Sequence, residues 1–184
     1  MVNKRVQSWW DNEGKILALK YICDSDEILV YGNNVAATYR IMISSPKGQS
    51  VVAYCGETGE AFIDKSGKLI SRGLFDRFRE HCYHFIRYPR HFLGLEPYEL
   101  GAYKIIFEVD RTCSDKENRK EREKQLILSQ KDKPYLQCSH FPKFPGKRID
   151  LCIRNQYRRS ALKEAFGDDW IEIPRTLNNE VYKM

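Results

Sequence analysis

Long hydrophobic runs are missing from this sequence. No stretch approaches the roughly 18 consecutive apolar residues that a transmembrane helix needs, so we expect no membrane partner. The first residues, MVNKRVQSWWDNEG, are too polar for a secretory signal peptide. Together these two absences favour a cytoplasmic protein. Disorder is not expected either, since 42% of the residues are hydrophobic and 30% are charged, as in globular domains.

Closely spaced cysteines are also missing. The six cysteines are scattered and none forms a CxxC pair, so free thiols in a reducing compartment are expected rather than disulfides. Two clusters combine cysteine and histidine, at 81–84 (HCYH) and 138–140 (CSH), but neither has the ligand spacing of a structural zinc site. The sequence therefore predicts no zinc.

The length and the charge set the scale of the protein. A chain of 184 residues is long enough to bury a substantial core, so we expect a single domain over 1–184. The formal net charge of +6 modestly favours a polyanionic partner such as a nucleic acid.

Strand patterns dominate the first half of the chain. Residues 35–44 alternate and are rich in β-branched and aromatic side chains, and 50–55 return as a second strand after the turn Pro46–Lys47–Gly48. A third strand is predicted at 102–110. Residues 15–23 fit either a short helix or a strand, and 27–31 fit a further strand.

Helical patterns flank these strands. Residues 74–88 have helical spacing of apolar side chains and stop at Pro89. A charged helix is predicted to begin at Ser114, with Glu117 completing a capping box. The last helix, predicted from near Leu151, would bury Leu151, Tyr157, Leu162 and Phe166.

These elements predict an α+β fold. We expect a small three-stranded antiparallel sheet flanked by helices, with the core of the domain at about 28–137. Residues 138–184 form a basic helical C-terminal extension, because 139–163 hold seven basic residues against one acidic residue.

A phenol, a permanent cation and a proton carrier fall close together in the predicted core. Tyr54 ends the second strand, whereas Arg77 and His81 are four residues apart on one helix face. This combination suits a phosphodiester better than a carbonyl group. The competing interpretations are that Tyr39 and Tyr54 only cover the sheet as cross-strand aromatics, and that His81 is an ordinary surface residue.

The order of these motifs resembles the GIY-YIG nuclease superfamily. Residues 37–41 (ATYRI) stand where G-I-Y-x-I would, 54–56 (YCG) stand for Y-I-G, and Arg77 with His81 reproduces R-x-x-x-H. Residues 123–127 (EKQLI) fit E-x-x-[LW]-I, and 133–137 (KPYLQ) resemble the K-P-x-[LW]-N that often follows. The resemblance covers 37–137 and implies that the core at about 28–137 is catalytic. It departs from the family at Ala37, Thr38 and Gln137, and the long loop before Leu74 is similar to the restriction-endonuclease branch.

The resemblance implies a DNA endonuclease that depends on a divalent metal and is similar to type II restriction enzymes. Glu123 would hold one Mg²⁺ or Mn²⁺ per active site, with Glu121 as a rival ligand. Arg77 and Tyr54 would bind the phosphate, and Tyr39 would activate or orient the attacking water. The proton would pass to His81 or to a loop lysine, Lys65 or Lys68, because a free phenol with a pKa of about 10 is a poor base.

Double-stranded DNA is the expected partner, bound by a homodimer in which each subunit cuts one strand. Four basic residues of the last helix are the candidate DNA contacts: Arg154, Arg158, Arg159 and Lys163.

Two alternatives to the nuclease stay open. One is a non-catalytic nucleic-acid-binding protein on the same scaffold, such as a phage anti-defence protein. The other is an acyl-transfer enzyme that uses Cys55 or Cys82.

Overall fold

Antiparallel strands form the centre of the protein. The computed structural model describes residues 4–23, 35–59, 65–67, 73–130 and 155–175. In this part of the chain the sheet has the strand order β1-β4-β2-β3. Its strands are β1 (Ile22–Cys23), β2 (Ala37–Ser44), β3 (Ser50–Thr58) and β4 (Lys104–Thr112).

The predicted three-stranded antiparallel sheet is confirmed by the pairing of β2 with both β3 and β4. Tyr39 faces Gly56 on one side and Val109 on the other. The stretch 15–23, which fitted either a helix or a strand, contains both: α2 (Lys15–Tyr21) leads directly into β1. Because β1 pairs with β4 in parallel over two residues, it adds a short fourth strand to the predicted sheet.

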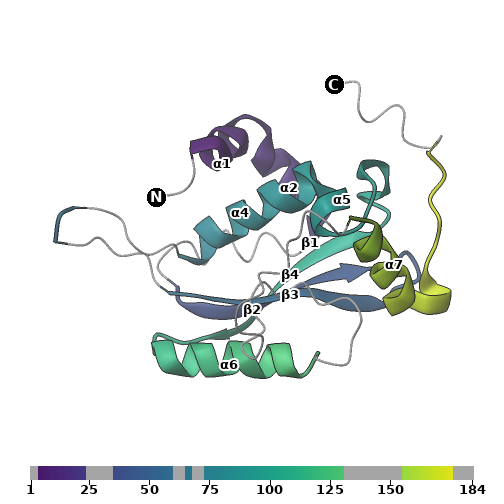
Figure 1. The fold of residues 1–184 in the computed structure, drawn as a ribbon. Coiled ribbons are helices and arrows are strands. Elements are labelled where there is room, and N and C mark those ends of the chain that lie inside the picture. The colour runs from purple at the N-terminus through teal and green to yellow at the C-terminus, as the bar shows by residue number, and fades with distance from the viewer. Residues whose placement is uncertain (1–3, 24–34, 60–64, 68–72, 131–154, 176–184) are drawn as a thin grey trace.

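Helices cover both faces of the sheet, as Figure 1 shows. One face carries α4 (Leu74–Arg87), with α2 and the N-terminal helices α1 (Lys4–Trp9) and η1 (Trp10–Gly14) around it. The opposite face carries α6 (Lys116–Leu128). The remaining helical segments are α5 (Pro89–Phe92), η2 (Pro97–Glu99), α7 (Asn155–Phe166) and η4 (Gly167–Asp169). The predicted α+β architecture of a sheet flanked by helices is therefore observed.

The main hydrophobic core lies between the sheet and α4. Side chains of the sheet, including Ile41, Ile43 and Phe107, pack against Leu74 and Phe78 of α4, and all five are at most 2% exposed. A second, smaller core lies beneath the sheet, where Cys55, Leu126 and Ile127 are buried together. Because side chains alternate along a strand, neighbouring residues of β3 can face opposite sides of the sheet, one covered by α4 and the other by α6.

Two tryptophans attach the N-terminal helices to this core. Trp9 and Trp10 are 4% and 7% exposed, and Trp10 makes edge contacts with Phe75 and Phe78 of α4. Trp9 packs in the same way against Tyr83. Such aromatic pairs contribute about 0.5–1.5 kcal/mol beyond the area that they bury. Residues 4–14 are thus helical and are anchored by their two tryptophan side chains.

The helix that carries the motif R-x-x-x-H matches its prediction, whereas the start of α6 differs. Helix α4 ends at Arg87, before Pro89. The N-cap of α6 is Asp115, whose Oδ1 accepts a hydrogen bond from the Asn118 backbone N–H at 2.7 Å. Ser114 is therefore not the cap, because an aspartate one residue later satisfies the free amide at the helix start.

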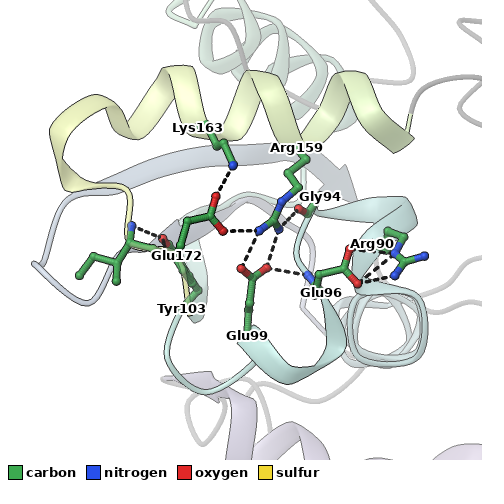
Figure 2. Close-up of polar contacts among 9 residues, drawn as sticks. Arg90, Gly94, Glu96, Glu99, Tyr103, Arg159, Lys163 and Glu172 are labelled. Atoms are coloured by element: carbon green, nitrogen blue, oxygen red, sulfur yellow. Dashed lines mark hydrogen bonds and ion pairs between the residues drawn. The ribbon is translucent and has the colours of Figure 1, made fainter. Parts of the chain in front are cut away.

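An ion-pair network fixes α7 to the rest of the protein (Figure 2). Arg159 of α7 donates two hydrogen bonds, at 2.6 and 2.8 Å, to the fully buried carboxylate of Glu99. It also donates to Gly94 O at 3.2 Å and to Glu172 at 3.0 Å, and Lys163 pairs with the same Glu172. On the apolar side, Leu162 and Phe166 are buried as predicted.

Several predicted features lie outside the described residues or side chains. They are the strand at 27–31, Lys68, the segment 133–137, Leu151, Arg154, and the side chains of Tyr157 and Arg158. None of the helices in the described part of the chain has the length and apolar character to cross a membrane.

Replacing Arg159 tests the ion-pair network. Arg159→Ala leaves the Glu99 carboxylate buried without its cation, and breaking such a pair costs about 3–5 kcal/mol of unfolding free energy. Lys163→Ala is the matched control on the same helix, since its pair with the exposed Glu172 is worth at most about 1 kcal/mol. Urea unfolding measures both changes. Equal stability of the two variants would contradict a structural role for Arg159.

Candidate functional site

Three of the predicted site residues meet on the α4 face of the sheet. The Tyr39 hydroxyl lies 3.0 Å from His81 Nε2, so a hydrogen bond joins β2 to α4. The Tyr39 ring stacks with Tyr54 of β3 at a centroid separation of 6.0 Å, and the Tyr54 ring lies 4.7 Å from His81. Both phenols therefore face the same side of the sheet as the imidazole.

Gly56 allows this close arrangement. A Cβ atom at Gly56 would lie 2.6 Å from Tyr54 Cε1 and 2.7 Å from both Cζ and Oη of Tyr39. Any side chain at this position would therefore displace one or both tyrosine rings. The YCG tripeptide therefore requires glycine at this position, because the two rings approach the backbone of Gly56 too closely for a side chain.

Burial controls protonation in this cluster. Burial, followed by the nearby Tyr54, raises the pKa of Tyr39 well above its ordinary value, so the phenol keeps its proton at neutral pH. Burial, together with the charges of Arg77 and His84, lowers the pKa of His81 to about 3. The imidazole is therefore neutral at physiological pH and can accept a proton at one nitrogen.

Arg77 lies beside this cluster, and its side chain is only partly buried. Its guanidinium is 3.4 Å from Glu80, and its Nε is buried without a hydrogen-bond partner. Its charge acts on Tyr39, His81 and Glu123, which places the cation close to all three side chains. The side chain is still 34% exposed, so an anion from solvent can reach it.

Glu123 approaches the same point from the opposite face of the sheet. It lies on α6, yet its carboxylate accepts a backbone hydrogen bond from Glu57 of β3, the edge strand of the described sheet. Burial raises the pKa of Glu123 and the Glu57 carboxylate raises it further, whereas the Glu57 backbone and the Arg77 cation lower it. The Glu123 carboxylate therefore lies beside the edge strand β3 and within the electrostatic influence of Arg77.

Five predicted residues therefore come together: Tyr39, Tyr54, Arg77, His81 and Glu123. The rival carboxylate Glu121 is 58% exposed and its nearest ion pair is with Lys124 at 3.5 Å. The candidate base Lys65 is exposed.

Two of the predicted DNA contacts, Arg159 and Lys163, are engaged in the ion-pair network that holds α7. The prediction that Arg159 binds DNA stays untested, although its charge is already balanced by Glu99. Arg154 and the side chain of Arg158 are outside the described part of the protein.

The two cysteines of the acyl-transfer alternative are both buried. Cys55 packs against Leu126 and Ile127 beneath the sheet, away from the cluster. Cys82 is fully buried, and burial raises its thiol pKa well above the ordinary value, which opposes the thiolate that a nucleophile requires.

Two residues next to Glu123 were missed from the sequence. Glu57 follows the YCG tripeptide directly, and Arg119 lies four residues before Glu123 on the same face of α6. Arg119 is 6% exposed, and its Nε donates to Glu57 Oε2 at 3.1 Å. The alternation of β3 was the available signal, because it places Glu57 on the same side as Cys55.

The donors present here fit a hard divalent cation. Carboxylate oxygens are ligands that Mg²⁺ prefers, and Mg²⁺ usually keeps several waters and needs only one or two protein carboxylates. Across the described residues, no group of three or more His, Cys, Asp or Glu side chains could hold a metal ion. A cation here would therefore be held by Glu123, with water completing its coordination.

Comparisons with known proteins add no relative. Neither a family model, nor a curated protein, nor a solved structure matches this chain.

The protonation of His81 gives the first test of this site. Its NMR signals should not titrate between pH 8 and pH 5, because its pKa in the folded protein is about 3. The unfolded chain takes up this proton near pH 6.5, so His81 makes the fold less stable as pH falls from about 6.5 toward 3. A side-chain titration centred near pH 6.5 in the folded protein would contradict the buried site.

Gly56→Ala tests the packing of the two tyrosines. We expect a loss of about 1–3 kcal/mol of unfolding free energy from overpacking, together with shifted NMR signals of the His81 ring. Gly48→Ala is the control: its added methyl group meets no atom within 4 Å, although its φ of +94° makes the substitution strained. It should lose stability without moving the His81 signals. Unchanged His81 signals in Gly56→Ala would contradict the geometry.

Proposed function

We propose that the protein is a metal-dependent DNA endonuclease of the GIY-YIG type. The observation that supports this proposal is the convergence of two phenols, a guanidinium, a neutral imidazole and a carboxylate from four separate elements, β2, β3, α4 and α6. The motif pattern of the sequence indicates the same set of residues. Chance packing of aromatic side chains would explain Tyr39 and Tyr54. It would not explain the carboxylate of Glu123 and the partly exposed cation of Arg77 beside them.

Arg77 binds the scissile phosphate in this proposal. Its guanidinium stays charged at every working pH and donates to two phosphate oxygens at once. The partial exposure of the side chain leaves the guanidinium accessible to a ligand. Tyr54, stacked beside Tyr39, fixes the orientation of the phosphate.

Tyr39 and His81 form the proton path. Because the pKa of Tyr39 is raised, its phenol stays protonated and orients the attacking water. The phenol gives up its own proton only as it accepts one from that water. The acceptor is His81 Nε2, 3.0 Å away. Its low pKa comes partly from the charge of Arg77, and a phosphate bound to Arg77 offsets that charge and makes the imidazole more basic.

Glu123 holds the divalent ion, Mg²⁺ or Mn²⁺, in this account. When bound, such an ion stabilises the negative charge that develops on the departing oxygen. Glu123 is suited to the role because it lies close to Arg77 and is only partly accessible to solvent, where a carboxylate interacts more strongly with a cation.

The substrate in this proposal is double-stranded DNA, cut at a specific sequence. A symmetric homodimer is the simplest assembly for this reaction, because each subunit then cuts one strand. Arg154 and Arg158 remain the candidate DNA contacts of the C-terminal region, with salt-dependent binding as their signature.

Plasmid cleavage tests the function. Supercoiled DNA should be nicked or cut with Mg²⁺ and left intact with EDTA. Glu123→Gln should lower the rate at least about 100-fold while DNA binding is retained, since a metal ion supplies several kcal/mol of transition-state stabilisation. Glu121→Gln, on the exposed side of the same helix, is the matched control and should cut at the wild-type rate.

The same assay separates the alternative, a non-catalytic nucleic-acid-binding protein on this scaffold. Such a protein would shift the mobility of the plasmid and generate no ends at any metal concentration. That result would contradict the endonuclease proposal.

A further inference from the structure

An open cleft of about 460 Å³ lies between the N-terminal helices and the C-terminal half of α4. Its wall includes Trp9 of α1, Glu13 of η1, and Tyr83 and Arg87 of α4. Tyr83 follows His81 by two residues, which is about 200° around a helix, so the cleft lies on a different face of α4 from the candidate active site. Figure 1 shows the N-terminal helices on the side of α4 that faces away from the sheet. We call this separate space the N-terminal cleft.

Positive charge prevails around the N-terminal cleft. Its described wall carries three cations, which are Lys4, Arg5 and Arg87. One carboxylate, Glu13, opposes them, and it lies 3.9 Å from Arg87. Both side chains of this ion pair are about half exposed, so the pair is worth at most about 1 kcal/mol. Three cations against one carboxylate leave an excess of two positive charges, which favours an anionic ligand.

Two aromatic rings lie beside these cations. The rings of Trp9 and Tyr83 meet edge to face at 5.4 Å, and the Arg87 guanidinium lies 5.8 Å from the centroid of Tyr83. The Trp9 ring packs over Gly14, where an added Cβ atom would come within 2.6 Å of it. Nucleotides combine a phosphate with a planar base, and proteins bind them with cations and aromatic side chains placed side by side. The wall of the cleft has this combination.

Two further features of the same wall are independent of its charge. Trp9 is 4% exposed, and its indole N–H is buried without a hydrogen-bond partner in the described part of the chain. Such unsatisfied donors are rare in folded proteins and call for an explanation such as a bound water or ion. The segment Trp10–Gly14 is a π-helix, a rare conformation that is frequent at functional sites. Both features favour a ligand site over a chance group of surface cations.

We propose that the N-terminal cleft binds a nucleotide. Its phosphate lies on the three cations, and its base packs against Tyr83. The nucleotide is either free or part of a nucleic acid strand, because both present the same phosphate and base. This inference goes beyond the proposed function and does not depend on it, since neither Arg77 nor Glu123 takes part. The competing interpretation is that the three cations are only solvated surface charges.

NMR titration of the full chain tests this inference, with EDTA present to prevent metal-dependent cleavage. The probes are deoxyadenosine monophosphate, inorganic phosphate and a short DNA duplex, and the signal followed is the indole N–H of Trp9. The mononucleotide should shift this signal at least about 10-fold more tightly than inorganic phosphate does, because the base adds its own contact. The indole N–H of Trp170, which packs against Tyr103, is the internal control in these two titrations and should not move.

Arg87→Gln tests the contribution of the cations. It removes one charge from an exposed side chain, and we expect it to weaken binding about 10-fold, as for the loss of a hydrogen bond to a charged group. Lys120→Gln is the matched control. Lys120 is 50% exposed, against 46% for Arg87, but it lies on α6 at the opposite face of the sheet. This variant should bind the mononucleotide as the wild type does.

The outcomes identify the source of the nucleotide or overturn the inference. A shift of the Trp9 signal with the mononucleotide but not with the duplex assigns a free nucleotide, and a shift with the duplex that Arg87→Gln weakens assigns a nucleic acid strand. A Trp9 signal that no probe moves, or equal affinity of Arg87→Gln and the wild type, overturns the inference. It leaves the endonuclease proposal standing, because plasmid cleavage tests that proposal separately.

Discussion

The alternation of side chains along β3 is the constraint on which the candidate site depends. Tyr54 and Gly56 face α4, where Gly56 leaves room for the Tyr39 and Tyr54 rings. Cys55 and Glu57 face α6, where Cys55 packs with Leu126 and Ile127. Because β3 is the edge strand of the described sheet, groups from both faces can approach each other around it. A register shift of one residue would reverse both faces and separate the phenols from the imidazole.

Local patterns predicted the core of the fold, and the resemblance to the GIY-YIG superfamily predicted the five clustered residues. Strand alternation predicted β2 and β3, and Pro89 set the end of α4. The contact between Glu123 and Glu57 could not be predicted in the same way, since it depends on how α6 packs beneath the sheet. The N-cap of α6 was misplaced by one residue, because Ser114 and Asp115 are both good capping residues and only the structure selects between them.

Basic residues in this protein are also used internally, which limits what net charge alone can predict. Arg159 neutralises the buried Glu99, Arg79 pairs with the buried Asp76, and Arg119 binds Glu57. A removed guanidinium would leave an uncompensated carboxylate in each case, so these arginines stabilise the fold whatever the ligand. Arg77 differs from them in exposure, since its side chain is 34% exposed, against 22% for Arg159, 11% for Arg79 and 6% for Arg119. This difference in exposure is visible only once the packing is known.

The central claim is that phosphate and metal bind together where Arg77 and Glu123 approach each other. The most direct measurement is a crystal structure of the Tyr39→Phe variant, which keeps the aromatic ring, with a short DNA duplex and Mn²⁺. The account predicts an anomalous manganese peak beside the Glu123 carboxylate and a DNA phosphate on the Arg77 guanidinium. DNA bound on another surface, with no manganese at Glu123, would contradict it.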